Sequence, residues 1–329
     1  MRHRIYDSMD LAPAAEREKM INEIIYRVMR FTILLMSHIP YPLAQFHGKG
    51  LGLFAYLIPL SRKKVALENI KQSFPEITDK EAKRLLRGVY MHFGRMFLEI
   101  PYIFRMTRDN LERYFVAEGE ENILAALSRK KGVFFLTAHF GNWEFLCAAG
   151  SLYLGNLAVL ARPADFAPLD RIIHELRSRF GTEVIPKQRA MRRLLGALKE
   201  NKLVGILLDQ NVDWYEGVYV PFLGRWACTN KGLALLALKT GTPVVPIFLV
   251  REKDGRYRVI FEKEVELRQT GDKTRDVEDN TEIFTRVIEK YVKKYPDHWF
   301  WFHKRWKTKN YCPLPVQQEE SWSIGGSER

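Results

Sequence analysis

The chain has 329 residues, 47% of them hydrophobic, and its 52 lysines and arginines exceed its 39 aspartates and glutamates, which leaves a net charge of +13. This apolar content excludes an intrinsically disordered chain and is enough for one large domain or two modest ones. Three scattered cysteines, Cys147, Cys228 and Cys312, exclude a disulfide framework and a four-thiolate zinc site. The excess positive charge favours an anionic partner, which charge alone leaves open between nucleic acid, acidic lipid and an acidic protein.

The N-terminal part of the chain carries a pattern typical of membrane association. Apolar residues recur at helical spacing over residues 20–29, which predicts an amphipathic helix. Residues 31–48 contain no charged side chain, but Pro40 and Pro42 interrupt them, so an apolar hairpin or interfacial anchor is favoured over a clean membrane span. The basic run at residues 62–64 would suit a cytoplasmic leaflet rich in acidic lipid. The alternative is that these segments are ordinary core helices.

A helix start is predicted at Thr78, because Glu81 follows it at the spacing of a capping box. Apolar residues then recur at helical spacing, and we expect this helix to end near Pro101. The start and the end together predict a long helix just ahead of the next part of the chain.

Beyond Lys131, short runs rich in β-branched residues alternate with longer helical patterns. The predicted strands are Val133 to Thr137, Leu157 to Leu160, Leu203 to Leu208, Val244 to Val250 and Tyr257 to Phe261. The predicted helices lie around Trp143 to Tyr153, Leu169 to Phe180, Met191 to Glu200, Gly232 to Thr240 and Thr281 to Tyr295. This alternation predicts an α/β fold with a mostly parallel central sheet flanked by helices.

We therefore divide the chain into three parts. Residues 1–110 are expected to form a helical, membrane-associating region, and residues 111–314 an α/β catalytic domain. Residues 315–329 are polar and are expected to be disordered.

The string GVFFLTAHFGNWEF, residues 132–145, carries the clearest chemical signal. A buried-looking strand leads into His139, a tight turn follows, and Glu144 stands in the first turn of the next helix. Ligands and catalytic groups collect at the carboxyl ends of strands in an open α/β sheet. A carboxylate five residues after the histidine can fold back to one imidazole nitrogen and leave the other free to take a proton. The pair is therefore a candidate general base with its orienting acid.

Other interpretations of this pair remain open from spacing alone. A helix N-terminus favours a negative charge such as that of Glu144, and a single histidine at a strand end, such as His139, is commonly a polar residue with its hydrogen bonds satisfied. No third ligand at suitable spacing indicates a metal site, and no G-x-S-x-G motif indicates a serine nucleophile.

The segment HFGNWE, residues 139–144, resembles the H-x4-D/E motif of glycerolipid acyltransferases. Its surroundings resemble the lipid A late acyltransferases of Gram-negative bacteria, the lauroyl/myristoyl acyltransferase family. The similar blocks appear in the family's order, and they are KKVALENIKQSFPEIT (63–78), ARP (161–163), LLDQN with GVYVPFLGRWACTNKG (207–232), TGTPVVPIFLVR (240–251) and HWFWFHKRWKTK (298–309).

The resemblance implies an O-acyltransferase with a glycerolipid acyltransferase-like fold. Such enzymes move a fatty acyl chain, usually from acyl carrier protein, to a lipid hydroxyl without a covalent acyl-enzyme. Carried over by motif, His139 would be the general base and Glu144 would orient it and support the imidazolium. No metal and no cofactor is implied, since the acyl thioester, on acyl carrier protein or coenzyme A, is a co-substrate.

The same resemblance implies substrate-binding residues. Arg162 would bind a lipid phosphate or the developing oxyanion, and Asp209 would hold either Arg162 or an acceptor sugar in place. Gln210 and Asn230 are candidate polar contacts. Several large apolar residues are candidates for the lining of an acyl groove, and they are Phe140, Trp143, Phe145, Phe166, Phe222, Leu223 and Trp226.

The expected partners follow from this assignment. The basic segments, Arg189 with Arg192 and Arg193, and His303 to Lys309, are candidate contacts for an anionic glycolipid or phospholipid and for acyl carrier protein. The expected location is the cytoplasmic face of the inner membrane. No nucleic acid is expected, because the sequence carries no recognised nucleic-acid-binding motif.

Three alternative functions stay open. The enzyme would acylate another acceptor, such as a phospholipid, a mannosylated inositol lipid or an aminolipid, or it would hydrolyse acyl thioesters with the same histidine. The third is a non-enzymatic basic membrane adaptor. Acyl length and the position acylated are not determined by the sequence.

Overall fold

The computed structural model describes residues 14–188 and 190–309. The predicted disordered tail, 315–329, and Arg189 of the first basic segment lie outside the described residues.

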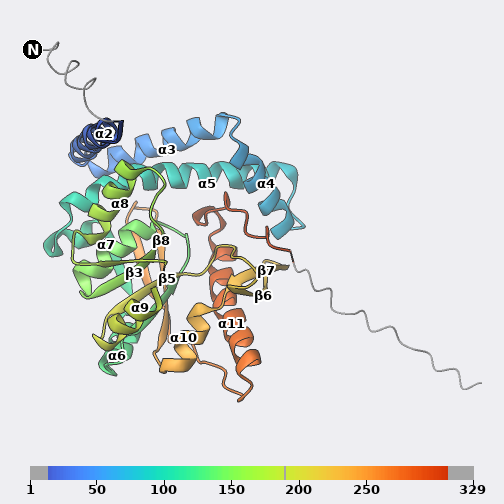
Figure 1. The fold of residues 1–329 in the computed structure, drawn as a ribbon. Coiled ribbons are helices and arrows are strands. Elements are labelled where there is room, and N and C mark those ends of the chain that lie inside the picture. The colour runs from blue at the N-terminus through green and yellow to red at the C-terminus, as the bar shows by residue number, and fades with distance from the viewer. Residues whose placement is uncertain (1–13, 189, 310–329) are drawn as a thin grey trace, which may run out of the picture.

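A seven-stranded sheet forms the centre of the fold (Figure 1). Its strands, in spatial order, are β1 (Phe115–Glu118), β9 (Tyr257–Phe261), β8 (Val244–Arg251), β2 (Val133–Thr137), β5 (Leu203–Leu207), β3 (Leu157–Ala161) and β4 (Glu183–Pro186). Neighbouring strands are parallel throughout except for β8 and β9, which are antiparallel. The predicted α/β fold with a mostly parallel sheet is therefore confirmed.

Helices cover both faces of this sheet, as its parallel strands require. They are α6 (Glu120–Ser128), α7 (Trp143–Tyr153), α8 (Ala167–Ser178), α9 (Ala190–Lys199), α10 (Gly232–Thr240) and α11 (Lys273–Lys294). On one face, α7 and α8 pack on Phe135 and Val159, and on the other, α9, α10 and α11 pack on Phe134 and Leu136. Alternate residues of β2 thus point into two separate cores.

The predicted helices and strands of this region are all found, with ends within a few residues except at α11, which begins eight residues before the predicted Thr281. The edge strands β1 and β4 were not predicted. An antiparallel hairpin of β6 (Gly217–Phe222) and β7 (Arg225–Asn230), which lies beside α11, was not predicted either (Figure 1). Both edge strands have only four residues, too few for an alternation pattern to be read.

Four N-terminal helices lie together at one end of the molecule (Figure 1). They are α2 (Ala14–Met36), α3 (Tyr41–Leu57), α4 (Ser61–Ser73) and α5 (Asp79–Glu99). Thr78 and Glu81 form the predicted capping box at the start of α5, and three short 3₁₀ turns, Ile100–Arg105, Arg108–Arg113 and Pro296–His298, complete the helical elements. Helices α3 and α5 cross at very short range. The absence of a side chain at Gly52 permits this, since a Cβ there would collide with the carbonyl oxygen of Tyr90.

The helical hairpin of α2 and α3 matches the predicted break at Pro40, which precedes the first turn of α3. Within the described residues, none of the helices combines the length and apolar character needed to cross a membrane.

Candidate active site

Two neighbouring strands deliver the central pair of side chains. Strands β2 and β5 are parallel, with Thr137 opposite Leu207. The second residue after each of these positions is therefore brought to the same edge of the sheet, and these residues are His139 and Asp209. His139 Nδ1 lies 2.8 Å from Asp209 Oδ1, and the His139 backbone N–H donates to Asp209 Oδ2 at 3.0 Å. One carboxylate thus fixes both the imidazole ring and its loop.

Asp209 is held in its ionised form inside the protein. Only 3% of its side chain is exposed. Burial alone raises the pKa of this carboxyl, but the His139 imidazole and the Trp299 indole N–H, which donates at 2.8 Å, outweigh burial and lower the pKa to about 2. An ionised Asp209 accepts a hydrogen bond from Nδ1–H, so the network assigns the lone pair of neutral His139 to Nε2. This is the tautomer that a general base needs.

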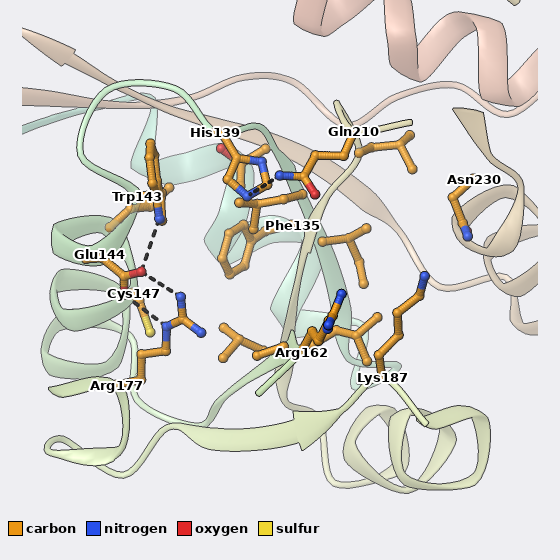
Figure 2. Close-up of a pocket in the computed structure, with 18 of the residues that line it drawn as sticks. Phe135, His139, Trp143, Glu144, Cys147, Arg162, Arg177, Lys187, Gln210 and Asn230 are labelled. Carbon is orange, nitrogen blue, oxygen red and sulfur yellow. Dashed lines mark hydrogen bonds and ion pairs between the residues drawn. The ribbon is translucent and has the colours of Figure 1, made fainter. Parts of the chain in front are cut away.

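The Nε2 side of the ring faces an opening. His139 lines a cavity of about 380 Å³, and 23% of its side chain is exposed. The amide nitrogen of Gln210 lies 3.1 Å from Nε2, so it occupies the direction from which a substrate hydroxyl would approach. Figure 2 shows the two side chains facing each other at one side of the cavity.

The turn after His139 depends on Gly141 and Asn142. Gly141 has a φ of +62°, and a Cβ there would collide with the carbonyl oxygen of Leu249. Asn142 caps α7 by accepting a hydrogen bond from the Phe145 N–H at 3.1 Å. The close approach of Gly141 to Leu249 and the cap at Asn142 together fix the conformation of the turn.

A buried carboxylate behind the turn holds the cap. Glu99 of α5 is fully buried and accepts hydrogen bonds from Arg251, at 2.9 Å to Nη2, and from the Tyr257 hydroxyl at 2.7 Å. It also accepts from Asn142 at 3.3 Å and from Gln45 of α3 at 2.9 Å. This network joins α3 and α5 to the loop that carries the imidazole.

Glu144 occupies a different place from the predicted one. Its carboxylate accepts hydrogen bonds from Arg177 of α8, at 2.9 Å from Nε and 2.6 Å from Nη2, and from the Trp143 indole at 3.1 Å. Among the described residues no hydrogen bond joins Glu144 to His139. The predicted contact between the two is therefore corrected, because Glu144 begins α7 and reaches α8, while Asp209 on the adjacent strand reaches the ring.

The Glu144–Arg177 pair forms part of the cavity wall (Figure 2). Burial by itself lowers the pKa of the Arg177 guanidinium, but the hydrogen bonds to Glu144 more than offset this and raise it. Cys147, one helical turn further along α7, also lines the cavity, and burial raises the pKa of its thiol to about 12. A neutral thiol is a poor nucleophile, so the cavity offers a base and no activated sulfur.

The other predicted binding residues are distributed around this cavity. Arg162, Gln210 and Asn230 all line it, and Arg162 is largely exposed and pairs with Asp165. Asp209 binds His139 and Trp299, while Arg162 pairs with Asp165, and no hydrogen bond or ion pair joins Asp209 to Arg162 in the described part of the chain. The predicted Asp209–Arg162 pairing is therefore corrected.

The predicted groove and the second basic segment need correction. Of the large apolar residues considered, only Trp143 lines the cavity, and the apolar wall comes instead from the sheet, with residues such as Phe135, Val159 and Leu207. Within the basic segment 303–309, Arg305 is fully buried and donates to the carbonyl oxygens of Gln210 and Cys228. Arg305 therefore joins the C-terminal segment to the segments that carry Gln210 and Cys228, and its guanidinium is not available to a partner.

Sequence reasoning missed Arg177 and assigned no role to Trp299. Trp299 forms an isolated bridge with Phe140, which brings the C-terminal segment against the loop that carries His139. The nearest signal was the aromatic density of HWFWFH, residues 298–303, which predicts burial but no partner. Among the described residues, no cluster of histidine, cysteine or carboxylate side chains is arranged to hold a metal ion.

An imidazole–carboxylate pair at the mouth of a partly apolar cavity, on the carboxyl edge of an α/β sheet, is typical of an enzyme that takes a proton from a substrate with an apolar chain. The chain belongs to the bacterial lipid A biosynthesis acyltransferase family, whose model matches residues 13–308, and it is an acyltransferase. The family resemblance is thereby confirmed.

Curated relatives agree with this family assignment. The chain is 24% identical over 277 residues to the lipid A biosynthesis palmitoleoyltransferase of Escherichia coli, covering 84% of this chain and 88% of the relative. It is also 24% identical to the lipid A biosynthesis lauroyltransferase of the same organism, covering 84% and 89%. A phosphatidylinositol mannoside acyltransferase of Mycolicibacterium smegmatis is 22% identical over 226 residues, covering 68% and 72%.

Proposed function

We propose that the protein transfers a fatty acyl chain from acyl carrier protein to a hydroxyl of a lipid A precursor, with His139 as general base and Asp209 as its orienting acid. The observation that carries the proposal is the hydrogen bond from His139 Nδ1 to the buried, ionised Asp209, at the mouth of a cavity in a chain of this family. The relatives named for lipid A support the acceptor class.

The reaction follows from the placement of Nε2. The acceptor hydroxyl would displace the Gln210 amide, give its proton to Nε2 and attack the thioester carbonyl. Collapse of the tetrahedral intermediate breaks the C–S bond, and the departing thiolate takes the proton back from the imidazolium. Asp209 stabilises that imidazolium throughout. Ester and thiol are the products, and His139 returns to its starting state.

The remaining charged groups of the cavity suit binding roles. We assign Arg162 to an anionic group of the acceptor, because its guanidinium is exposed at the cavity and permanently charged. Lys187 lines the same cavity. Glu144 keeps Arg177 fixed in the opposite wall, so its contribution to catalysis is through the shape and charge of that wall.

The direct test is mass spectrometry of a lipid A precursor incubated with the purified full chain and acyl carrier protein loaded with one fatty acid, with the matching acyl coenzyme A as a second donor. We expect the acceptor to gain one acyl chain. His139→Ala should reduce the rate by about 10²- to 10⁴-fold. His174→Ala is the matched control, because this exposed histidine on α8 lies outside the cavity lining.

Each outcome assigns a function. A His139→Ala variant that keeps more than about a tenth of the wild-type rate contradicts the general base. Release of free fatty acid without gain on any acceptor identifies a thioester hydrolase. Acylation of a mannosylated inositol lipid or a phospholipid in place of the lipid A precursor keeps the mechanism and corrects the acceptor.

We further propose that α2 and α3 seat the enzyme on the cytoplasmic face of the inner membrane. Along α2, Ile24, Val28, Phe31 and Leu35 follow helical spacing and are each 47–68% exposed. On α3 and just after it the exposed apolar residues are Leu43, Phe46, Leu51, Leu53, Phe54, Leu57, Ile58 and Leu60. More than half of the large apolar side chains exposed in the described chain lie in residues 21–60, an excess suited to a lipid surface.

Flotation with vesicles that contain acidic phospholipid tests this seating. The full chain should float with the vesicles, and a variant with Phe31→Ser and Phe46→Ser should float less at unchanged thermal stability. A wild-type protein that stays at the bottom of the gradient at low salt contradicts the proposal. Replacing two exposed apolar residues, Leu124 on α6 and Leu235 on α10, should have no effect, because these helices lie at the opposite end of the molecule from α2 and α3 (Figure 1).

A further inference from the structure

Two cavities share one face of the sheet. The catalytic cavity lies under the N-terminal half of α7, and a second cavity of about 480 Å³ lies under its C-terminal half. Along β3 the boundary falls between Val159, which lines the first, and Leu157, which lines the second. Along β5 it falls between Leu207 and Leu203. The two cavities are therefore successive parts of one slot between α7 and the sheet.

Small residues on α7 open this slot. Cys147 faces the first cavity, and Ala149 and Gly150 face the second. Gly150 lies three residues after Cys147 and Ala149 three residues after Leu146, which places these residues on the part of α7 that lines the slot. Short side chains there leave space between the helix and the strands.

Two side chains line both cavities, and they are Phe135 in the middle of β2 and Leu146 on α7. Each is only 5% exposed. One comes from the sheet and the other from the helix, and both stand where the two cavities adjoin. We call this pair the floor of the catalytic cavity.

The Phe135 ring can lie across the slot because the neighbouring strand has no side chain there. Gly205 of β5 is the direct partner of Phe135 in the parallel register. A Cβ on Gly205 would stand 2.5 Å from Cζ and 2.7 Å from Cε1 of that ring. Glycine at this position of a central strand is otherwise unfavourable, and here it makes room for the floor.

We propose that Phe135 and Leu146 set the upper limit of acyl chain length. The inference rests on the proposed acyl transfer: with the thioester carbonyl at His139, the hydrocarbon chain extends along the slot until it reaches the floor. The second cavity is the space that a longer chain occupies once the floor is removed. Its lining beyond the floor is apolar in the slot and becomes polar at Glu112, Glu120 and Arg256, where a hydrocarbon chain would gain no further contact.

The experiment compares acyl carrier proteins loaded with lauroyl, myristoyl, palmitoyl and stearoyl chains. Phe135→Leu and Leu146→Ala each open the floor from one wall, and both should shift the preferred donor to a longer chain. The rate ratio of the longer to the originally preferred donor should rise about tenfold. Leu203→Ala is the matched control, because it enlarges the second cavity and leaves the floor intact.

Unchanged donor preference in both active floor variants overturns the proposal, as does an equal shift in Leu203→Ala. Wild-type protein provides a test that needs no variant and no transfer activity. Thermal stabilisation by free lauric, myristic, palmitic and stearic acids should rise along the series and then fall at the first chain longer than the slot above the floor. A rise that continues through stearic acid contradicts the floor. Absence of transfer by the wild type would refute the proposed function instead.

Discussion

Two carboxylates flank the catalytic turn, and their surroundings differ. Asp209, beyond the end of β5, is buried and binds the imidazole and an indole. Glu144, at the start of α7, binds the guanidinium of Arg177 across the cavity wall. The partner of the first is a group that changes charge during the proposed reaction, while the partner of the second is permanently charged.

The two carboxylates therefore have different roles: Asp209 supports proton transfer by His139, and Glu144 holds Arg177 in the cavity wall. A carboxylate next to an imidazole gains interaction energy when the ring takes a proton, so its effect is expressed in the transition state. A carboxylate next to arginine gives the same energy before and during the reaction. The two residues should therefore respond differently to the same chemical substitution, carboxylate to carboxamide.

The largest effect is expected from Asp209→Asn. The carboxamide can donate to Nδ1 and so favours the wrong tautomer, and it cannot stabilise the imidazolium. We expect kcat to fall about 10²- to 10⁴-fold with KM nearly unchanged. Because the pKa of Asp209 is about 2, wild-type Asp209 stays ionised throughout a kcat profile measured above pH 5, so its titration should not appear there.

The control for Asp209→Asn is Asp276→Asn. Asp276 is another buried aspartate, whose carboxylate accepts hydrogen bonds from Thr270 and Gly271 away from the cavity. It should lose stability and keep kcat. An Asp209→Asn enzyme with more than a third of wild-type kcat would show that the ring is oriented by another group.

Glu144→Gln should have a smaller effect on turnover, about tenfold, and a clear effect on stability. Removing the carboxylate leaves the Arg177 charge half-buried without its partner, which costs about 1–3 kcal/mol of unfolding free energy. The double variant Glu144→Gln with Arg177→Gln should recover part of that stability, as measured by denaturant unfolding.

A loss of turnover without a loss of stability in Glu144→Gln would contradict the different roles assigned to the two carboxylates. If Glu144→Gln lost as much kcat as Asp209→Asn at unchanged stability, Glu144 would be the carboxylate that orients His139, as the motif suggests. The contacts of the structure would then describe a resting state only.

Much of the fold was readable from the sequence because its signals are local. Strand β2 is a continuous apolar run, and the capping box at Thr78 is formed by residues three positions apart. His139 was found because a polar residue after a buried strand stands at the ligand-binding edge. These inferences needed no knowledge of which strands are neighbours.

The partner of His139 could not be found in this way. Glu144 is five residues from His139 and Asp209 is seventy residues away. Only the pairing of Thr137 with Leu207 shows that the two strand ends coincide. The same holds for Arg177 and Trp299, whose roles depend on packing between distant segments.

The free energy of unfolding should depend on pH through His303, an imidazole whose pKa is affected by both His139 and Asp209. Burial, first of all, lowers the pKa of this imidazole to about 4, with Arg305, His139 and Arg62 acting in the same direction and Asp209 against it. The unfolded chain takes up this proton near the ordinary pKa of 6.5, before the folded chain does. The stability that goes with a neutral His303 is therefore fully present above pH 6.5 and is lost as the pH falls to about 4. The free energy of unfolding changes by about 1–3 kcal/mol over this range. His303→Gln should flatten the pH dependence of the unfolding free energy over this range, and an unchanged slope would contradict the assignment.

The smallest effect is expected from Trp299→Phe. The indole N–H is one of three groups that donate to Asp209, so its loss leaves the carboxylate ionised and still bound to His139. We expect kcat to fall about threefold and the unfolding free energy to fall by about 1 kcal/mol. Trp301→Phe removes an indole N–H that donates to the carbonyl oxygen of Pro296, outside the dyad. The two variants should lose similar stability, but only Trp299→Phe should lose turnover. Equal kcat values for the two would mean that the third donor to Asp209 serves packing alone.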